Sequence, residues 1–359
     1  MNIVIRRRAI ALALAALGTC GAARAQSAAD IAQAKVEGQV VIYSATDQKQ
    51  IAPLLRDFEA LYPAIKVEYH DMNSTEVYNR FISESAAGAS ADVMWSSAMD
   101  LQVKLVNDGY ALAYKLSDAS KLPDWAIWKN EAFGTTYEPV GFVYNKRLVD
   151  AADVPKTHAD FTRLLTAKAD KFKGKVTTYD PEKSGVGFSF HSQDALTNPA
   201  GFWELAKAMG QTGVRVQSST GTMMERIASG ENLIGYNLLG SYALTRAAKD
   251  PSIGVSFPTD YTLVMSRVMF IAKGAKHPAA AKVFLEYILS QRGQTVIASD
   301  ADLFAIRSDV KGDTTISGLQ AQLGNALKPI VIGPGLLTYL DQAKRLEFLK
   351  QWNAVKSPK

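Results

Sequence analysis

The sequence has 359 residues, of which 47% are hydrophobic and 21% charged, with a formal net charge of +5 and one cysteine. A chain of this length can bury the cores of two domains. Loss of residues 1–25 would remove four arginines, no acidic residue and the cysteine, and would leave a charge of +1. A nearly neutral chain without cysteine excludes disulfides, thiol nucleophiles and thiolate metal sites. It also argues against a nucleic-acid or membrane-surface partner.

The first 25 residues have the order of a secretory signal peptide. Three consecutive arginines precede the apolar residues 9–17, and a small-x-small triplet ends at Ala25. The apolar stretch is about half the length that a transmembrane helix needs. We therefore predict cleavage after Ala25 and a periplasmic protein. A mature N-terminal helix and lipid attachment at Cys20 are the alternatives, although Thr19 stands where a lipid-attachment box has Gly, Ala or Ser.

From Gly38 the sequence alternates short β-rich runs with helical periods, which is the pattern of parallel α/β units. Strands are predicted at residues 40–44, 65–69, 91–95, 175–179 and 233–237. Helices are predicted after each of the first strands, with a late start near Pro53 in the first of them, and at residues 278–289 and 339–352. Helix starts are also predicted at residues 73–76, Ser97-x-x-Asp100, Thr157-x-x-Asp160, Asn198-Pro199 and Thr222-x-x-Glu225.

Two long extended segments, residues 133–148 and 261–272, suit strands that leave one lobe for another. Two crossings imply two lobes that are discontinuous in sequence, with a cleft between them. The predicted organisation is a signal peptide (1–25), the first part of lobe 1 (26–140), lobe 2 (141–262), and a return to lobe 1 with C-terminal helices (263–359).

Four segments carry a resemblance to a known family: residues 40–47, 91–97, 140–146 and 180–187. Together they resemble the extracellular solute-binding proteins of the ferric-iron and sugar-phosphate branch, which are periplasmic components of ABC importers. The resemblance implies an α/β, two-lobed type II periplasmic binding fold with two connecting strands. It also implies one solute held between the lobes and delivered to an ABC permease in the inner membrane, with no catalysis and no cofactor.

Ferric-binding members of that branch use neighbouring tyrosines after the strand that is residues 233–237 here. This sequence departs from that pattern, because Tyr236 and Tyr242 are six residues apart and Asn237 follows the first. The resemblance therefore favours a small anionic organic solute: a sugar phosphate, an organophosphate or phosphonate, or a carboxylate.

Independently of the family, several predicted helix starts directly follow strand ends, at the edge of the sheet that borders the crevice in an open α/β lobe. Free N–H groups at a helix start carry roughly half a positive charge and suit an anion. In lobe 1 the candidate ligand-binding residues are Ser44, Thr46, Asp47, Ser96 and Ser97. Plain N-capping is the competing interpretation for Thr46.

In lobe 2 the candidates after the strand at 175–179 are Ser184, Gly185 and Gly187, where glycine lets the backbone approach a ligand closely, although a simple turn competes. Thr222 is assigned to capping, which leaves its neighbours for the cleft. The remaining candidates are Ser219, Thr220, Tyr236, Asn237 and Asp260, of which Tyr236 has a core role as its alternative. Lys183, Arg226 and Arg267 are expected to be solvated or structural charges.

An enzyme is an alternative class of exported protein. The sequence has no H-E-x-x-H pair, no G-x-S-x-G elbow and no P-loop, and its four histidines assemble no nucleophile with a base, so we predict no enzyme. A ferric-ion binding protein and a periplasmic sensor for a two-component kinase stay open as alternatives. The expected mechanism is hinge closure of a monomer around its solute.

Overall fold

A computed structural model describes residues 22–88 and 90–356. The proposed signal peptide lies almost wholly outside these residues. The first described helix, α1 (Ala22–Glu37), spans the predicted cleavage point. Among the described helices, none has the length and apolar character needed to cross a membrane.

The first sheet has the strand order β2-β1-β3-β12-β5-β4. Its centre is parallel: β1 (Gln39–Ser44) pairs with β2 (Lys66–Asp71) and with β3 (Val93–Ser96). β12 (Val268–Ile271) then runs antiparallel to β3 and to β5 (Ala132–Gly134), and β4 (Ile127–Trp128) closes the edge. Strand β12 comes from far along the sequence, so the chain returns to this sheet after leaving it.

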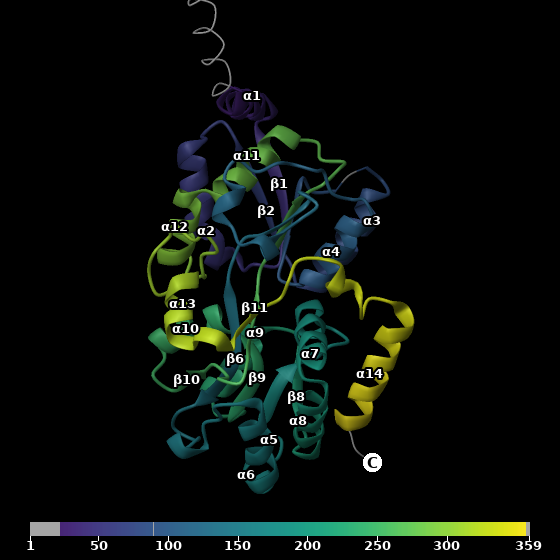
Figure 1. The fold of residues 1–359 in the computed structure, drawn as a ribbon, viewed down its shortest axis with the longest axis vertical. Helices are drawn as coiled ribbons and strands as arrows, with labels where there is room; N and C mark the ends of the chain where they lie inside the picture. Colours follow the sequence, from purple (N-terminus) through teal and green to yellow (C-terminus); the bar gives the residue numbers. More distant parts are fainter. Residues whose placement is uncertain (1–21, 89, 357–359) are drawn as a thin grey trace, which may run out of the picture.

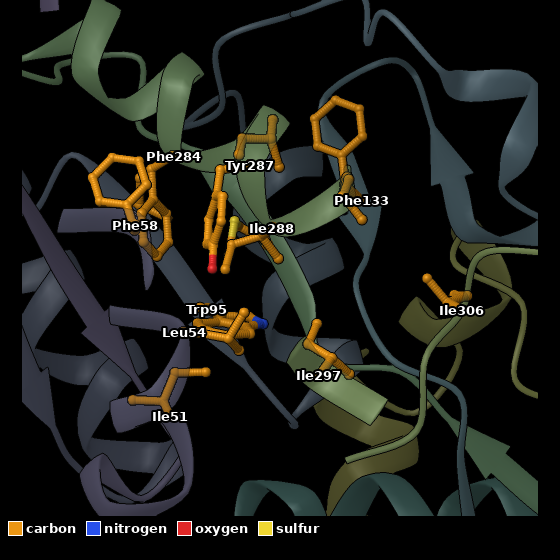
Figure 2. Packing of buried hydrophobic residues seen from close by; sticks show 14 of the residues in the cluster. Ile51, Leu54, Phe58, Trp95, Phe133, Phe284, Tyr287, Ile288, Ile297 and Ile306 are labelled. Atoms are coloured by element: carbon orange, nitrogen blue, oxygen red, sulfur yellow. The ribbon is translucent and has the colours of Figure 1, made fainter. Parts of the chain in front are cut away.

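The first sheet and the helices packed on it are called the first lobe, which lies in the upper half of Figure 1. Its core joins Phe58 of α2 to Trp95 of β3 and to Phe284 and Tyr287 of α11, with the Phe58 and Phe284 rings 5.1 Å apart (Figure 2). The helices of this lobe after α1 are α2 (Gln48–Leu61), α3 (Ser74–Ser85), α4 (Met99–Asn107), α11 (Pro278–Leu289), α12 (Gln291–Ser299) and α13 (Ile316–Leu323).

The second sheet has the order β13-β11-β6-β9-β7-β8, and β10 pairs with β6. Its strands are β6 (Glu138–Asn145), β7 (Val176–Tyr179), β8 (Arg215–Gln217), β9 (Ile234–Leu239), β10 (Ile253–Ser256), β11 (Thr262–Met265) and β13 (Leu327–Pro329). With its helices this sheet is called the second lobe. The helices are α5 (His158–Ala167), α6 (Ala169–Phe172), α7 (Gly185–Thr197), α8 (Pro199–Gln211), α9 (Thr220–Ala228), α10 (Gly240–Lys249) and α14 (Gln342–Lys356).

The chain passes between the lobes from β5 to β6 and returns from β11 to β12. The segment after α13 then crosses again, because β13 pairs with β11 and α14 packs on α8 of the second lobe. Short 3₁₀ turns fill the connections: η1 (Ala119–Lys121), η2 (Asp124–Ala126), η3 (Ala151–Asp153), η4 (Gly324–Ala326) and η5 (Pro334–Leu337). The C-terminal segment, yellow in Figure 1, therefore touches both lobes.

Two of these helix starts differ from the sequence-based expectation. Helix α2 begins at Gln48 and holds Pro53 inside it, since the buried face with Ile51 and Leu54 outweighs one missing N–H. Helix α4 is capped by neither Ser97 nor Asp100, because it begins after Ala98. The starts at Asn73 and Thr157 are confirmed by side-chain caps that accept backbone N–H groups.

Candidate ligand site between the lobes

The turn from β1 to α2 reaches across to the second lobe. Ser44 is fully buried and its Oγ accepts the N–H of Thr46 at 3.1 Å. Asp47 is the N-cap residue of α2, but its carboxylate makes no capping bond. Its backbone N–H instead donates to the hydroxyl of Tyr242, in α10, at 3.3 Å. This turn is therefore a point of contact between the two lobes.

A buried ion pair lies behind this turn, where the chain crosses between the lobes. Arg267, between β11 and β12, donates from Nε to Glu138 Oε1 at 2.8 Å, and Glu138 stands at the start of β6. Arg267 also donates from Nη1 to the Thr46 hydroxyl at 3.0 Å. Both charged side chains are fully buried. Burial lowers the pKa of Arg267, but the charge of Glu138 outweighs burial and the pKa is raised.

The Glu138 carboxylate has further donors. The hydroxyl of Thr136 donates to Oε1 at 2.8 Å, and the hydroxyl of Ser241, at the start of α10, donates to Oε2. The guanidinium lies 5.2 Å from the centre of the Tyr242 ring. The Arg267–Glu138 pair thus connects both crossings with α10 and with the β1–α2 turn. Because water is excluded there, each of the two charges needs the other to offset the cost of its burial.

The start of α7 meets the first lobe. The N–H of Gly185 donates to the hydroxyl of Thr75 at 3.1 Å, and the N–H of Val186 donates to the hydroxyl of Ser74 at 3.2 Å. The Thr75 hydroxyl donates onward to the carbonyl of Lys183 at 3.3 Å. Two amides at the positive end of α7 are thus satisfied by hydroxyls at the start of α3 in the opposite lobe.

Glycine at position 185 favours this close approach. A Cβ added there would lie 2.9 Å from Leu101 Cδ1, 3.2 Å from Ala98 Cβ and 3.2 Å from Ser74 Oγ. Gly187 has a different role, since a Cβ there would lie 2.3 Å from Tyr179 Cβ within the second lobe. Gly185 permits lobe-to-lobe contact, whereas Gly187 permits packing of α7 on β7.

The serines after β3 lie beside the start of α7. Ser96 Oγ accepts the N–H of Ala98 at 3.2 Å, and Ala98 is the residue that Gly185 approaches. Ser97 is buried in the same turn. Ser184 caps α7, with its Oγ accepting the N–H of Gly187 at 3.2 Å. The structure therefore brings the Ser96 turn and the Ser184 turn together across the lobe boundary.

The start of α9 corrects another expectation. Ser219, not Thr222, is the N-cap residue, and its Oγ accepts the N–H of Thr222 at 3.2 Å. Thr222 lies inside the helix because the chain turns helical at Thr220, so its hydroxyl is not the cap. Thr220 is buried and its hydroxyl bonds with the phenol of Tyr179. Ser219 is exposed but engaged in capping.

The last three candidates lie within the second lobe, away from the β1–α2 and β3–α4 turns. Tyr236 is fully buried and donates to Asp194 Oδ2 at 2.5 Å, and Asn237 donates to the same oxygen. The Tyr236 ring packs 6.1 Å from that of Phe142. Asp260 bonds with the His158 ring at 3.1 Å. Tyr236 thus has the core role that was its alternative, with Asn237 beside it.

Sequence reasoning missed several residues of this boundary. Ser74 and Thr75 lie directly after the predicted cap Asn73, so their proximity to a helix start was visible. Glu138 is the one acidic residue of the crossing segment 133–148 and Arg267 the one charged residue of the segment 261–272, and their opposite signs were a signal that the two segments pair. Tyr179 and Tyr242 carried no such signal, because only the packing of the lobes shows what they face.

Residues 54–318 match the family model of the bacterial extracellular solute-binding protein. The match covers most of the chain, and the chain belongs to this family. It is similar to the substrate binding protein of an ABC transporter from Agrobacterium tumefaciens, with 40% identity, a TM-score of 0.84, and coverage of 89% of this chain and 94% of that chain. The predicted family membership and the type II periplasmic binding fold are confirmed.

More distant structures share the fold. AfuA from Actinobacillus pleuropneumoniae, solved with fructose-6-phosphate bound, is 19% identical with a TM-score of 0.72, covering 88% of this chain and 97% of that chain. Iron-bound HitA from Pseudomonas aeruginosa is 18% identical with a TM-score of 0.67, covering 88% and 99%. The protein is thus a periplasmic solute-binding component of an ABC importer, from a family of binding proteins and not of enzymes.

Proposed function

We propose that the protein captures a small anionic organic solute between its lobes and delivers it to an inner-membrane permease as a monomer. The solute is a sugar phosphate, an organophosphate or phosphonate, or a carboxylate. The proposed lobes are residues 26–140 with the return from 263, and residues 141–262, after removal of residues 1–25; β13 and α14 of the returning segment pack on the second lobe. The proposed contacts are the hydroxyls and amides of the β1–α2, β3–α4 and β7–α7 turns.

The observation that carries the proposal is the pair of α7 amides, Gly185 and Val186, that face the hydroxyls of Thr75 and Ser74. Amides at a helix start that are satisfied across a domain boundary can exchange those partners for ligand oxygens when the lobes open and reclose. Such amides favour anions, because the positive end of the helix adds to each N–H. The buried Arg267 supplies a positive charge nearby, although Glu138 balances it.

The tyrosines favour an organic anion over a ferric ion. Tyr236 bonds with Asp194 inside the second lobe, whereas Tyr242 receives the N–H of Asp47 at the lobe boundary. The two phenols therefore have different partners and do not converge. Burial raises the pKa of Tyr242 to about 12 and that of Tyr236 well above its ordinary value, so both phenols hold their protons at neutral pH.

A thermal-shift panel of sugar phosphates, phosphonates, dicarboxylates and ferric citrate tests the ligand class. A true ligand at about 100 times its dissociation constant stabilises the native protein by about 2.7 kcal/mol. We expect at least one organic anion to raise the melting temperature. A shift with ferric ion alone would overturn the proposed solute class.

Gly185→Ala tests the position of the site with the same panel. The added methyl group meets Leu101, Ala98 and Ser74 across the boundary, so we expect at least a tenfold loss of affinity with little change in the melting temperature of the free protein. Gly274→Ala is the matched control, since a Cβ there meets nothing within 4 Å. Equal ligand responses in both variants would place the site elsewhere.

A further inference from the structure

Asp100 lies in the first turn of α4, beside the surface where α4 meets α7 of the opposite lobe. Its side chain is buried, and neither carboxylate oxygen has a hydrogen-bond partner among the residues that the structure describes. The next residue, Leu101, lies against Gly185 of α7, as Ala98 does. A carboxylate buried without a partner destabilises the state that buries it.

One cation acts on this carboxylate from the other lobe. Arg345 belongs to α14, which packs on α8 of the second lobe and buries Phe348 and Trp352 in that lobe's core. Its guanidinium lies 3.9 Å from the centre of the Phe188 ring, in α7. Asp100 and Arg345 attract each other but form no direct ion pair. Figure 1 shows α14 beside α7 and α8, below the end of α4.

Other charged groups near the first turn of α4 have partners or act elsewhere. On the elements packed against α4, these groups are Lys183 before α7, His191 and Asp194 within α7, and Arg267 before β12. Glu76 stands at the start of α3, which packs on α7. On α4 itself, Lys104 pairs with Asp108. Among the described side chains, Arg345 is the one whose charge reaches Asp100. Arg345 therefore offsets only part of the free-energy cost of burying an ionised Asp100.

We propose that Asp100 links closure of the lobes to proton uptake, so that closure is favoured when its carboxyl group is protonated. When the carboxyl group is ionised, Arg345 on the second lobe partly offsets the free-energy cost of burying its negative charge. The proposal rests on the hinge closure of the proposed function, since separation of α7 from α4 is what would return water to Asp100. Asp100 affects ligand binding through the packing of the two lobes and does not itself contact the solute.

The direction of the pH effect on closure depends on whether the open or the closed form binds the proton of Asp100 more tightly. Burial raises the pKa of Asp100 to about 7 in the described form, although the positive charge of Arg345 opposes this shift. In an open form with Asp100 in water the pKa returns to about 3.9. The closed form thus binds more protons between these values. The closing constant should fall by up to about tenfold per pH unit as the pH rises from 5 to 7, and it should level off above 7.

Fluorescence energy transfer between the lobes measures closure. Ala60, exposed in α2, and Ala167, exposed at the end of α5, are replaced by cysteine and labelled in the protein without residues 1–25, which has no other cysteine. Transfer is recorded from pH 5 to 9, without ligand and with each anion of the thermal-shift panel. We expect less transfer in the free protein as the pH rises to 7.

Asp100→Asn should remove this pH dependence and hold the protein at the high-transfer limit, because the amide stays neutral. Arg345→Gln should extend the loss of transfer above pH 7, and Arg345→Lys should restore the wild-type curve. Asp108→Asn, on the exposed end of the same helix, is the control for loss of one negative charge and should behave as the wild type.

The outcomes separate the two proposals. If anions change the transfer but the pH curve of Asp100→Asn matches the wild type, or the wild type shows no pH dependence, the Asp100 proposal is wrong and hinge closure stands. If neither pH nor any anion changes the transfer, hinge closure itself is wrong. The proposed attraction between Asp100 and Arg345 is supported if Arg345→Lys shows the wild-type pH dependence and Asp100→Asn shows none.

Discussion

His191 lies in α7 with its ring enclosed by aromatic side chains. The ring centre is 4.7 Å from that of Trp352 and 5.9 Å from that of Phe202. Its Nδ1 has no hydrogen-bond partner within the described part of the chain. Burial lowers the pKa of His191 to about 3, so the ring is neutral in the native protein at every physiological pH. His191 therefore has a structural place in the second lobe, behind the start of α7.

The lowered pKa predicts acid sensitivity. Below about pH 6.5 the imidazole of His191 is protonated in the unfolded chain. In the native protein it stays neutral until the pH falls to about 3. Each pH unit in that window should lower the free energy of unfolding by about 1.4 kcal/mol from this group alone. His191→Phe should remove that contribution, as measured by urea unfolding between pH 4 and 8. His70→Phe, in β2, is the control for loss of an imidazole.

Asp100 acts in the opposite direction over nearly the same pH range. Its raised pKa means that the native protein holds a proton that the unfolded chain loses above about pH 3.9, so this stabilisation is lost as the pH rises to about 7. Removal of His191 should therefore expose a decline of stability with rising pH. An unchanged pH profile in His191→Phe would contradict the neutral, buried state of this ring.

At the scale of elements, the last helix, α14, packs on the second lobe although the chain had already returned from that lobe to the first. Helix α14 packs on α8, and Phe348 and Trp352 are 2% and 1% exposed in the core of the second lobe. The sequence-based prediction placed a helix near residues 339–352 as packing support, with no site assigned. Its place on the second lobe follows from β13, which pairs with β11 and directs the chain across.

Trp352 should contribute strongly to the stability of the second lobe. Truncation of a buried aromatic residue to alanine costs about 3–5 kcal/mol, because apolar contacts are lost and a cavity remains. We expect Trp352→Ala to lower the urea midpoint markedly. Leu346→Ala, on the same helix at 61% exposure, should change the free energy of unfolding by less than about 0.5 kcal/mol. Similar losses in both variants would show that α14 is not docked as described.

At the scale of the whole molecule, the two strand crossings are joined by one buried ion pair, Arg267 with Glu138. Such a pair adds little net stability relative to an apolar pair, but removal of one partner leaves an uncompensated buried charge. We expect Arg267→Met to cost about 3–5 kcal/mol in urea unfolding. Arg292→Met, which breaks the exposed pair with Asp57, should cost about 1 kcal/mol or less.

A double variant separates charge from packing. Addition of Glu138→Met to Arg267→Met removes both charges, so it should recover part of the lost stability even though a second residue has changed. A double variant less stable than Arg267→Met would show that the hydrogen bonds of Glu138 with Thr136 and Ser241 outweigh the cost of its unpaired charge. The measurement thereby tests how the lobe boundary is held at its centre.

The sequence by itself determined strands β1, β2, β3, β7 and β9, most helices, the two crossings and the caps at Asn73 and Thr157, because these depend on periodicity and on local hydrogen bonding. It did not predict the short strands β4, β8, β10 and β13. It also identified the Ser96 and Ser184 turns that the fold brings together. It misplaced the caps of α4 and α9, since several hydroxyls in a row can each satisfy the same helix start.

Only the tertiary structure decided which polar residues face the other lobe. Tyr236 and Asn237 turn toward Asp194, whereas Ser74 and Thr75 meet the start of α7. The pairing of Glu138 with Arg267 and the burial of Asp100 likewise arise between segments far apart in sequence. Local sequence fixes where a helix or strand begins, but the partner of a buried polar group is fixed by the packing of the lobes.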